Sequence, residues 1–303
     1  MSGIKVIKPE EFRQMQLLEL GMLKEFDRVC RANKIPYTIF GGTLLGAVRH
    51  KGYIPWDDDA DIAMLRQDYE RFKKIASQLN ADICYFQDNT TDPEYRWGYG
   101  KLRRTGTKYI RIGQEHLKCK TGVFVDVFPM DDIPLSTIGK VINDFYCFCL
   151  RKILWAEVGR LDISEGKVKR LWYGLLAKIP SEFVFDRLQA LAAKSSNDSP
   201  NQVRTLLFPA TGKLYKRNPV KLRYGMPKEW FTDLIEYEFE DTRLYGTRDY
   251  DTILTYIYGD YMKLPPVEKR EQHSPVSDYD FGGSHSSSIA CAGGADMPGG
   301  LND

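Results

Sequence analysis

Apolar residues recur at helical spacing near the start of the chain. One of every three or four positions between residues 9 and 33 is apolar, which predicts an amphipathic helix whose stripe faces a core. Pro9 suits the first turn of such a helix, because a residue there needs no backbone N–H. The stripe consists of Met15, Leu18, Met22, Phe26 and Val29.

Short β-prone runs and short helices alternate in the next segment. Residues 37–40 predict a strand that stops at a Gly-Gly pair, and residues 43–49 predict a short helix. A strand in the second half of 56–64 and a helix over 68–79 follow. Helices and strands in this order favour an α/β or α+β core.

The middle of the chain adds strands and then a long helical stretch. Residues 95–103 and 107–112 alternate in polarity, which predicts a hairpin with its turn at residues 105–106. Residues 122–128 predict a strongly apolar strand, and residues 137–194 are helical in pattern.

These patterns divide the chain into four parts. We expect a core in 1–136, a helical insertion that covers it in 137–200, and a C-terminal part in 201–273 that completes the core with further strands and a helix near 249–258. Residues 274–303 contain no Lys or Arg and are rich in Gly and Ser, which predicts a disordered tail. The predicted fold class is α+β, a mixed sheet flanked by helices with a helical insertion.

Composition excludes several classes of protein. The chain has 303 residues, of which 43% are hydrophobic and 28% charged, as in ordinary globular proteins. With 43 basic and 41 acidic side chains its net charge is +2, which argues against a nucleic-acid binder. No stretch approaches the ~20 apolar residues of a membrane span, and the first residues lack the apolar region of a secretory signal. We therefore expect a cytoplasmic protein.

The six cysteines give no sign of a metal site. None forms a CxxC pair, and no histidine lies at zinc-finger spacing from them. We expect reduced, mostly structural thiols, because the context is cytoplasmic, and we expect no zinc, because the spacing of a zinc module is missing. The six are Cys30, Cys84, Cys119, Cys147, Cys149 and Cys291.

The strongest candidate chemistry lies at Asp59 and Asp61. Side chains two apart in a strand point the same way, so both carboxylates face one side while Ala60 and Ile62 pack on the other. Two such charges repel each other unless a cation lies between them, and Mg²⁺ prefers carboxylates together with phosphate oxygens. The pair predicts a site for Mg²⁺, with Mn²⁺ as the alternative ion. The other interpretation is a solvated acidic turn that caps a helix.

Asp126 interrupts the apolar strand 122–128 and is the natural third ligand. An ionised carboxylate among apolar neighbours is costly unless it is paired or bound to a metal. It could instead form a buried salt bridge with Arg103 or Arg104, or face water at a strand edge. Within the site it would either ligate the ion or do acid–base work. Two further acids follow in what we interpret as a loop, Asp131 and Asp132.

Groups that could bind a phosphate are also present. Gly41-Gly42 and Thr43 open the predicted short helix, where backbone N–H groups and the helix dipole favour an anion. Basic side chains could clamp a pyrophosphate, although each is equally consistent with a solvated surface charge. His50 is either a general base or a structural residue. The candidate cations are Arg49, Lys101 and Arg103.

Residues 151–178 interleave basic side chains with aromatic ones. Basic helices that carry aromatic residues can lie on an anionic membrane surface. An amphipathic helical cover over the core explains the same pattern. Both interpretations stay open, so peripheral membrane contact is an alternative to a purely cytoplasmic location.

Four stretches together resemble the LicD family of phosphotransferases. The last of them contains Tyr258, Gly259 and Asp260. The stretches are FGGTLLGAVRHKGYIPWDDDADIAM (40–64), YGKLRRTGTKYI (99–110), GVFVDVFPMDDIP (122–134) and YIYGDYMKLPPVEKREQH (256–273).

The resemblance implies a fold and an activity. The fold is a nucleotidyltransferase (polymerase-β-like) core. The activity is transfer of a phospho-alcohol, typically phosphocholine, from a CDP-activated donor to a sugar hydroxyl of a cell-surface glycan or its lipid-linked precursor. By motif, Asp59, Asp61 and Asp126 would be the metal triad, and residues 258–260 a signature beside the site. Ala60 stands where the family commonly has a β-branched residue.

Two other functions remain open. A true nucleotidyltransferase that releases pyrophosphate needs the same acids, and an inactive binding protein on the same fold is the third possibility. If choline is transferred, an aromatic cage for its quaternary ammonium is expected. The candidate cage residues are Trp56, Tyr95, Trp97 and Tyr261.

Overall fold

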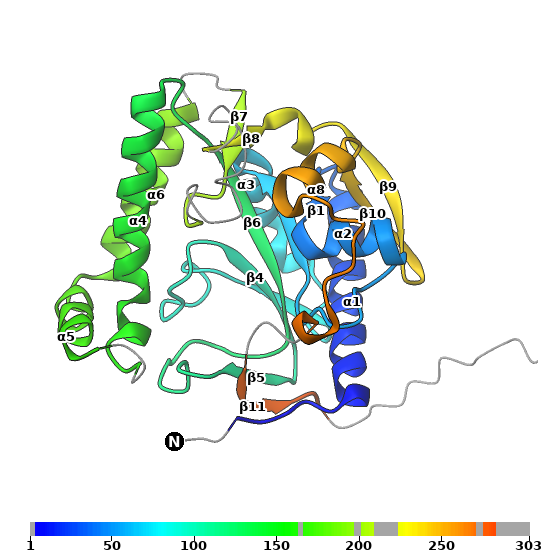
Figure 1. The fold of residues 1–303 in the computed structure, drawn as a ribbon, viewed down its shortest axis with the longest axis horizontal. Coiled ribbons are helices and arrows are strands. Elements are labelled where there is room, and N and C mark those ends of the chain that lie inside the picture. Colours follow the sequence, from blue (N-terminus) through cyan, green and yellow to red (C-terminus); the bar gives the residue numbers. More distant parts are fainter. Residues whose placement is uncertain (1–3, 163–165, 197–200, 209–223, 271–274, 283–303) are drawn as a thin grey trace, which may run out of the picture.

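The computed structural model describes residues 4–162, 166–196, 201–208, 224–270 and 275–282, and all structural statements concern these ranges. The chain opens with helix α1 (Pro9–Ala32), which agrees with the predicted helix to within one residue. Its stripe is buried, and Met22, Phe26 and Val29 have no exposed surface. Contacts of α1 with two central strands fix it against one side of a mixed sheet (Figure 1).

The central sheet is mixed, in agreement with the predicted α+β class. Its strand order is β1-β2-β6-β4-β3, and β7 and β8 extend it beyond the end of β6. The pair β2 and β6 is parallel, whereas the other pairs are antiparallel. The strands are β1 (Thr38–Ile39), β2 (Asp61–Leu65), β3 (Cys84–Gln87), β4 (Gly100–Arg104), β6 (Phe124–Asp132), β7 (Gln202–Arg204) and β8 (Met226–Pro227).

Two short helices flank β2 in the chain. Helix α2 (Gly41–His50) starts directly at the Gly-Gly pair, two residues before its predicted start. Helix α3 (Arg66–Ile75) follows β2 without a loop and continues into a 3₁₀ turn, η1 (Ala76–Gln78). The core between helices and sheet contains side chains such as Leu44 and Ile62, which have no exposed surface.

The segment predicted as one helical stretch consists of three helices, which we call the helical arm. They are α4 (Thr137–Gly159), α5 (Lys167–Leu176) and α6 (Ser181–Ser196). The arm lies to one side of the sheet (Figure 1) and has its own small apolar cluster, in which Cys147, Leu150 and Val184 are buried. Helix α6 also contacts β6, so the arm is attached to the core along the central strand.

The C-terminal part adds a hairpin, a helix and a returning strand. The hairpin (residues 234–247) and the helix (residues 250–258) both pack on α2, so both help to hold α2 beside β2. Two 3₁₀ turns lie in the same part, η3 (Lys228–Phe231) and η4 (Val267–Lys269). The other elements are β9 (Leu234–Phe239), β10 (Thr242–Thr247), α8 (Tyr250–Tyr258) and β11 (Val276–Asp280).

Three sequence predictions about the strands were wrong: the hairpin in 95–112, the tail that begins at 274, and the loop at 131–132. The predicted hairpin does not form, because β4 pairs with β3 and β6 while β5 (Lys108–Arg111) pairs with β11. Residues 276–280 are therefore a strand and not part of a tail, and 283–303 lie outside the described residues. Asp131 and Asp132 belong to β6 and form ion pairs, so they are not loop residues.

Five cysteines lie in the described ranges, and none of them forms a disulfide there. Cys30, Cys84, Cys119 and Cys147 are buried, and Cys149 is half-buried. Burial raises the pKa of the Cys84 thiol to about 12, which keeps it protonated and unreactive. In the same ranges, no helix combines the length and the apolar character needed to cross a membrane.

Candidate active site

Three side chains stand in a row across the centre of the sheet. The parallel register of β2 and β6 sets Asp61 opposite Asp126, and the antiparallel register of β6 and β4 sets Lys101 opposite Asp126. Paired residues on neighbouring strands point to the same face, so two carboxylates and one ammonium share one surface. The Lys101 ammonium donates to Asp126 Oδ1, and both side chains are buried. The partner of Asp126 is therefore Lys101 and neither Arg103 nor Arg104.

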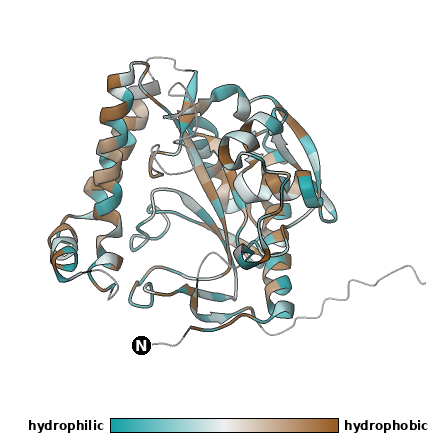
Figure 2. Ribbon diagram, in the orientation of Figure 1, coloured by the Kyte–Doolittle hydropathy of each residue, from teal (hydrophilic) through white to brown (hydrophobic). Residues whose placement is uncertain are grey.

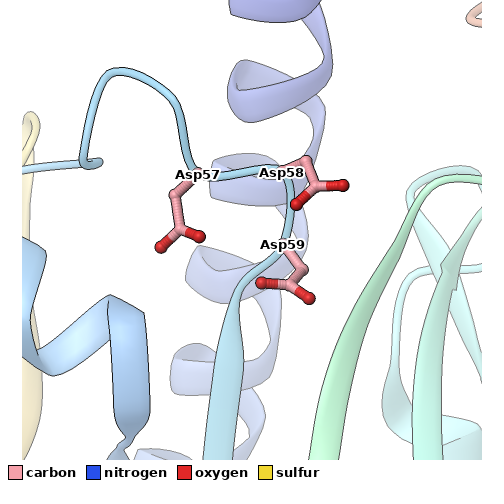
Figure 3. Close-up of side chains that lie close together, drawn as sticks. All are labelled: Asp57, Asp58 and Asp59. Atoms are coloured by element: carbon pink, nitrogen blue, oxygen red, sulfur yellow. The ribbon is translucent and has the colours of Figure 1, made fainter. Parts of the chain in front are cut away.

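Asp59 belongs to an acidic loop that leads into β2. Oxygen atoms of Asp57, Asp58 and Asp59 all lie within 4.8 Å of one another. Figure 3 shows Asp57 on the side of α2, whereas Asp58 and Asp59 lie on the side of β6. Asp57 and Asp58 are buried, which is uncommon for acidic side chains. Five acids are thus gathered at one end of β2, counting Asp61 and Asp126, where the sequence predicted three.

The two glycines at the start of α2 allow Asp61 and Asp57 to lie close to the helix backbone. A Cβ on Gly41 would lie 2.9 Å from Asp61 Oδ2, and one on Gly42 would lie 2.3 Å from Asp57 Oδ2. Gly41 also has a φ of +55°, a conformation that side chains disfavour. Thr43 Oγ1 accepts a hydrogen bond of 2.8 Å from the Asp61 backbone N–H, which fixes the start of β2 against the helix.

The electrostatics of Asp61 are those of a carboxylate surrounded by other acids. Burial raises the pKa of Asp61 well above its usual value, and the charges of Asp59, Asp126 and Asp57 raise it further, whereas Lys101 opposes them. Burial lowers the pKa of Lys101 to about 8, with Arg103 and Arg111 adding to the effect and Asp126 opposing it. A divalent cation beside Asp61 would relieve this repulsion.

Arg111, on β5, is a site residue that sequence reasoning missed. Its guanidinium lies 3.6 Å from Asp59 Oδ2 and over the ring of Phe124, 4.8 Å from the ring centre. Burial lowers the pKa of Arg111, but Asp59 and Asp126 outweigh this effect and the pKa is raised. Arg111 lines a small hollow together with Lys101 and Arg103. Its strand, β5, pairs with the distant β11.

The other predicted cations have different surroundings. Arg103 donates to Gln87 Oε1 at 2.6 Å and to the Gly122 carbonyl at 2.9 Å, so two of its five N–H groups join neighbouring segments of the core. Arg49 donates to the Tyr261 carbonyl at 2.7 Å, at the end of α2 away from Gly41. Eight residues of helix separate them by ~12 Å. Arg49 therefore ties α2 to the segment after α8.

The C-terminal signature reaches the site through one residue. The Tyr258 hydroxyl lies 3.7 Å from the position of a Cβ on Gly41, so its ring reaches the start of α2. Gly259 ends α8 with a φ of +79°, which a glycine adopts at low cost. Asp260 is exposed just beyond it. His50, at the other end of α2, packs edge-on against Trp56.

Glu19 is a second residue that the sequence did not single out. It lies on α1 beside the acidic loop and is 1% exposed. Burial raises its pKa well above the usual value, and the charges of Asp59, Asp58 and Asp57 add to this effect. A neutral Glu19 adds no further negative charge to the loop. In the sequence it was one more polar position of an amphipathic helix.

The four aromatic candidates for a choline cage do not form one group. Tyr95 and Trp97 are in ring contact at 5.6 Å. Trp56 instead carries the guanidinium of Arg270 over its ring at 5.1 Å, and the Tyr261 hydroxyl donates to Asp251. Among the described residues, no other ring contact joins members of this set, so its assignment stays a prediction.

The donor atoms around β2 fit a hard divalent cation. All candidate ligands are carboxylate oxygens, which suit Mg²⁺ or Mn²⁺ and do not suit a thiolate-preferring ion. Asp59 and Asp61 would hold the ion, as the sequence predicted. Asp126 shares one oxygen with Lys101, which leaves Oδ2 for a ligand role. The assignment of the triad remains a prediction.

Comparison with known proteins agrees with the resemblance seen in the motifs. A family model described as "LicD/FKTN/FKRP, nucleotidyltransferase domain" matches residues 34–146, which contain α2, β2, β4 and β6. That range holds the acidic loop and the row of Asp61, Asp126 and Lys101. The description of the family names a nucleotidyltransferase domain, and the mixed sheet with flanking helices is compatible with that description.

The similarity extends beyond that domain. The lipopolysaccharide cholinephosphotransferase LicD of Haemophilus influenzae is 30% identical over 276 residues, which are 88% of this chain and 97% of that protein. An uncharacterized protein of Rickettsia typhi is 40% identical over 76 residues, or 25% of this chain. Another from Rickettsia prowazekii is 44% identical over 58 residues. The chain belongs to the LicD family and is a LicD-type transferase.

Proposed function

We propose that the chain transfers phosphocholine from a CDP-activated donor to a sugar hydroxyl of a cell-surface glycan or its precursor, with Mg²⁺ or Mn²⁺ as cofactor. The similarity to the Haemophilus protein along nearly its whole length supports phosphocholine as the group transferred. The observation that carries the proposal is the row of Asp61, Asp126 and Lys101, with Arg111 beside it. This arrangement offers both carboxylates for an ion and cations for a diphosphate.

The reaction exchanges one phosphorus–oxygen bond for another. The acceptor hydroxyl oxygen bonds to the phosphorus that carries choline, and the bond from that phosphorus to the bridging oxygen breaks. CMP leaves with the electron pair, and the hydroxyl proton passes to a base. A divalent ion, when bound, neutralises charge that develops on the leaving phosphate.

The chain's own residues supply the rest. Lys101 and Arg111 line one hollow and can both approach the donor phosphates, which lowers the cost of the negative charge on CMP. Gly41 keeps the start of α2 open, because any side chain there would collide with Asp61. Asp126 would orient the acceptor hydroxyl or take its proton, in addition to its bond to Lys101.

Product analysis tests the proposal. The purified chain is incubated with CDP-choline, CDP-ribitol, CDP-glycerol or CTP, with Mg²⁺ and a lipopolysaccharide-derived oligosaccharide. Release of CMP from CDP-choline, with phosphocholine on the oligosaccharide, is the expected result. Pyrophosphate from CTP would instead identify a nucleotidyltransferase and refute the proposal.

Matched variants test the roles of the acids. Asp59→Asn and Asp61→Asn should each lower CMP release at least 100-fold, because each removes charge that holds the ion. Asp241→Asn is the control, since this exposed acid lies at the turn between β9 and β10 and, among the described residues, forms an ion pair with Lys24 alone. It should leave turnover unchanged.

A further inference from the structure

A pocket of about 300 Å³ lies between the helical arm and the segment that leads into β4. We call it the arm pocket. Helix α4 contributes Arg151 and Trp155, and the segment before β4 contributes Arg96, Trp97 and Tyr99. Phe208, beyond β7, adds a further aromatic wall. Nothing in the function proposed above has assigned a role to these residues.

Two rings connect the arm pocket to the candidate active site. Trp97 lines the arm pocket and also the hollow that contains Lys101 and Arg111. The Tyr99 ring lies 5.4 Å from the Lys101 ammonium, which in turn holds Asp126. A ligand in the arm pocket would therefore contact Tyr99, whose ring lies beside the Lys101 partner of Asp126, and Trp97, which also lines the hollow of Lys101 and Arg111.

The arm pocket is positively charged without an acid to balance it. The arginines Arg96 and Arg151 line it, and no carboxylate does. Within the described ranges neither arginine forms an ion pair: Arg96 donates to the Leu154 carbonyl at 3.2 Å and Arg151 to the Leu207 carbonyl at 3.2 Å. The Nη2 atom of Arg96 is buried and has no hydrogen-bond partner there. Two arginines and no carboxylate in the lining of a partly buried pocket favour an anionic ligand, although the charge of Asp144, outside the lining, acts on Arg151.

The lining also indicates what the rest of the ligand is. Trp97, Tyr99, Trp155 and Phe208 present flat apolar faces, on which a sugar ring can stack while its hydroxyls stay in water. A quaternary ammonium is unsuited, because two guanidinium groups would repel it and no carboxylate would attract it. The choline group must therefore bind elsewhere.

We propose that the arm pocket binds the acceptor, a sugar that carries a phosphate or carboxylate group close to the ring that receives the phosphocholine. Only the role of this sugar as the acceptor rests on the proposed function. The binding of an acidic sugar follows from the pocket's own charges and rings. Arg96 and Arg151 hold the anionic group, and the aromatic side chains orient the ring toward Asp126.

Calorimetric titration of the full chain tests binding without any turnover. The probes are glucose 6-phosphate, glucuronate, glucose and inorganic phosphate. We expect glucose 6-phosphate or glucuronate to bind at least tenfold more tightly than glucose, and the stronger of the two identifies the anionic group. Arg151→Gln and Arg96→Gln should each weaken that binding about tenfold, the usual effect of losing a charge-assisted hydrogen bond.

Controls separate a binding role from a structural one. Arg151→Lys keeps the charge and should retain most of the binding, and thermal unfolding checks that each variant is folded. Arg187→Gln, an exposed arginine on α6 that stacks only on Phe183, should bind like the wild type. Equal binding of glucose and the acidic sugars would overturn the proposal. So would weaker binding of CDP-choline in Arg151→Gln with no change for the acidic sugar.

These outcomes are independent of the proposed function. If the chain released no CMP from CDP-choline yet bound an acidic sugar through Arg151, the proposed reaction would be refuted and the proposed ligand of the arm pocket would be confirmed. If CMP were released and the acidic sugars did not bind, the pocket assignment would be wrong and the reaction right.

A separate observation concerns the outer surface of the helical arm. Helix α5 exposes its apolar stripe: Val168 is 84% exposed, Leu171 70% and Trp172 58%, at positions three and four residues apart. Leu175 continues the stripe. Amphipathic helices of globular proteins normally bury this face. Helix α5 instead buries Tyr173, which contacts Gly159 of α4.

Helix α4 repeats the pattern along its first half. Its exposed apolar side chains are again three and four residues apart, and Figure 2 shows hydrophobic segments along the helix. They are Ile138, Val141, Ile142 and Phe145. Helix α5 contains three cations and no acid. Apolar side chains on a helix whose only charged residues are basic suit the surface of an anionic bilayer.

We infer that the exposed face of α5, continued by α4, docks on an anionic lipid surface. Co-sedimentation of the full chain with vesicles of phosphatidylcholine and phosphatidylglycerol tests this. Binding is expected at low salt, with little binding to phosphatidylcholine alone. Leu171→Glu should lower it at least tenfold, whereas Leu17→Glu, an exposed apolar residue on α1, should not. Absence of vesicle binding, or a dimer in solution that Leu171→Glu abolishes, would overturn the inference.

Discussion

Replacement of Asp61 by Asn should stabilise the metal-free protein and abolish its activity. In the metal-free state the Asp61 carboxylate faces Asp126 across one strand pair, with Asp59 beside it. For charges ~5.5 Å apart at an effective dielectric constant of ~20, one such repulsion costs about 3 kcal/mol. Lys101 offsets part of this cost. We therefore expect Asp61→Asn to raise the free energy of unfolding by about 1–3 kcal/mol at neutral pH.

The pH dependence of this difference follows from the raised pKa of Asp61. A carboxyl group whose pKa is raised in the folded state stabilises the fold most below its usual pKa of 3.8 and loses that contribution as pH rises. The wild type should therefore lose stability relative to Asp61→Asn as pH rises from about 4 to 7. The two proteins should be nearly equally stable at the acidic end.

Denaturant unfolding in EDTA, repeated with Mg²⁺, measures these effects. Mg²⁺ should stabilise the wild type and leave Asp61→Asn unchanged, while CMP release from CDP-choline is lost in the variant. Asp241→Asn serves as the control in both assays. The reasoning fails if Asp61→Asn is less stable than the wild type in EDTA and is stabilised by Mg²⁺ to the same degree.

Three further predictions concern the surroundings of Asp61. Gly42→Ala would place a Cβ 2.3 Å from Asp57 Oδ2, and it should lower the free energy of unfolding by about 1–3 kcal/mol and abolish most of the activity. Gly21→Ala, at a position on α1 with open space around it, should instead stabilise the fold. Urea titration of both variants measures the difference. Because the pKa of Lys101 is about 8, its charge is present below pH 8 and lost above it. CMP release should fall with an apparent pKa near 8, and Lys101→Arg should move this fall upward by more than one pH unit, so an unchanged profile would contradict the role of Lys101. Arg111→Gln should raise the KM for CDP-choline about tenfold, while Lys108→Gln, an exposed cation on the same strand, should not; equal KM values would exclude Arg111 from donor binding.

Local patterns predicted the elements around the site well. The stripe that ends at Val29 gave α1 to within one residue, and the helix predicted near 249–258 is α8. The acid inside an apolar run correctly marked Asp126 as a buried carboxylate that needs a partner. Each of these conclusions depends only on residues close together in the chain.

Partners that are distant in the chain were not predictable in the same way. Alternation of polarity identifies β5 as a strand, but it cannot say that β5 pairs with β11, more than 160 residues later. Arg111 was missed for this reason, because its approach to Asp59 depends on that pairing. Asp131 looked like a loop residue because its ion-pair partner, Arg66, lies in a separate element and cannot be recognised from the local sequence. Glu19 is ordinary in a helical pattern, and only its position beside the acidic loop makes it unusual.

The most direct test of the central claim is the binding of Mn²⁺ to the chain in the presence of CDP-choline, followed by electron paramagnetic resonance. The account predicts that the wild type and Asp241→Asn bind the ion and that CDP-choline tightens its binding. Asp59→Asn and Asp61→Asn should bind it at least 100-fold more weakly. If both variants bound Mn²⁺ and CDP-choline as tightly as the wild type, these two carboxylates would not hold the ion.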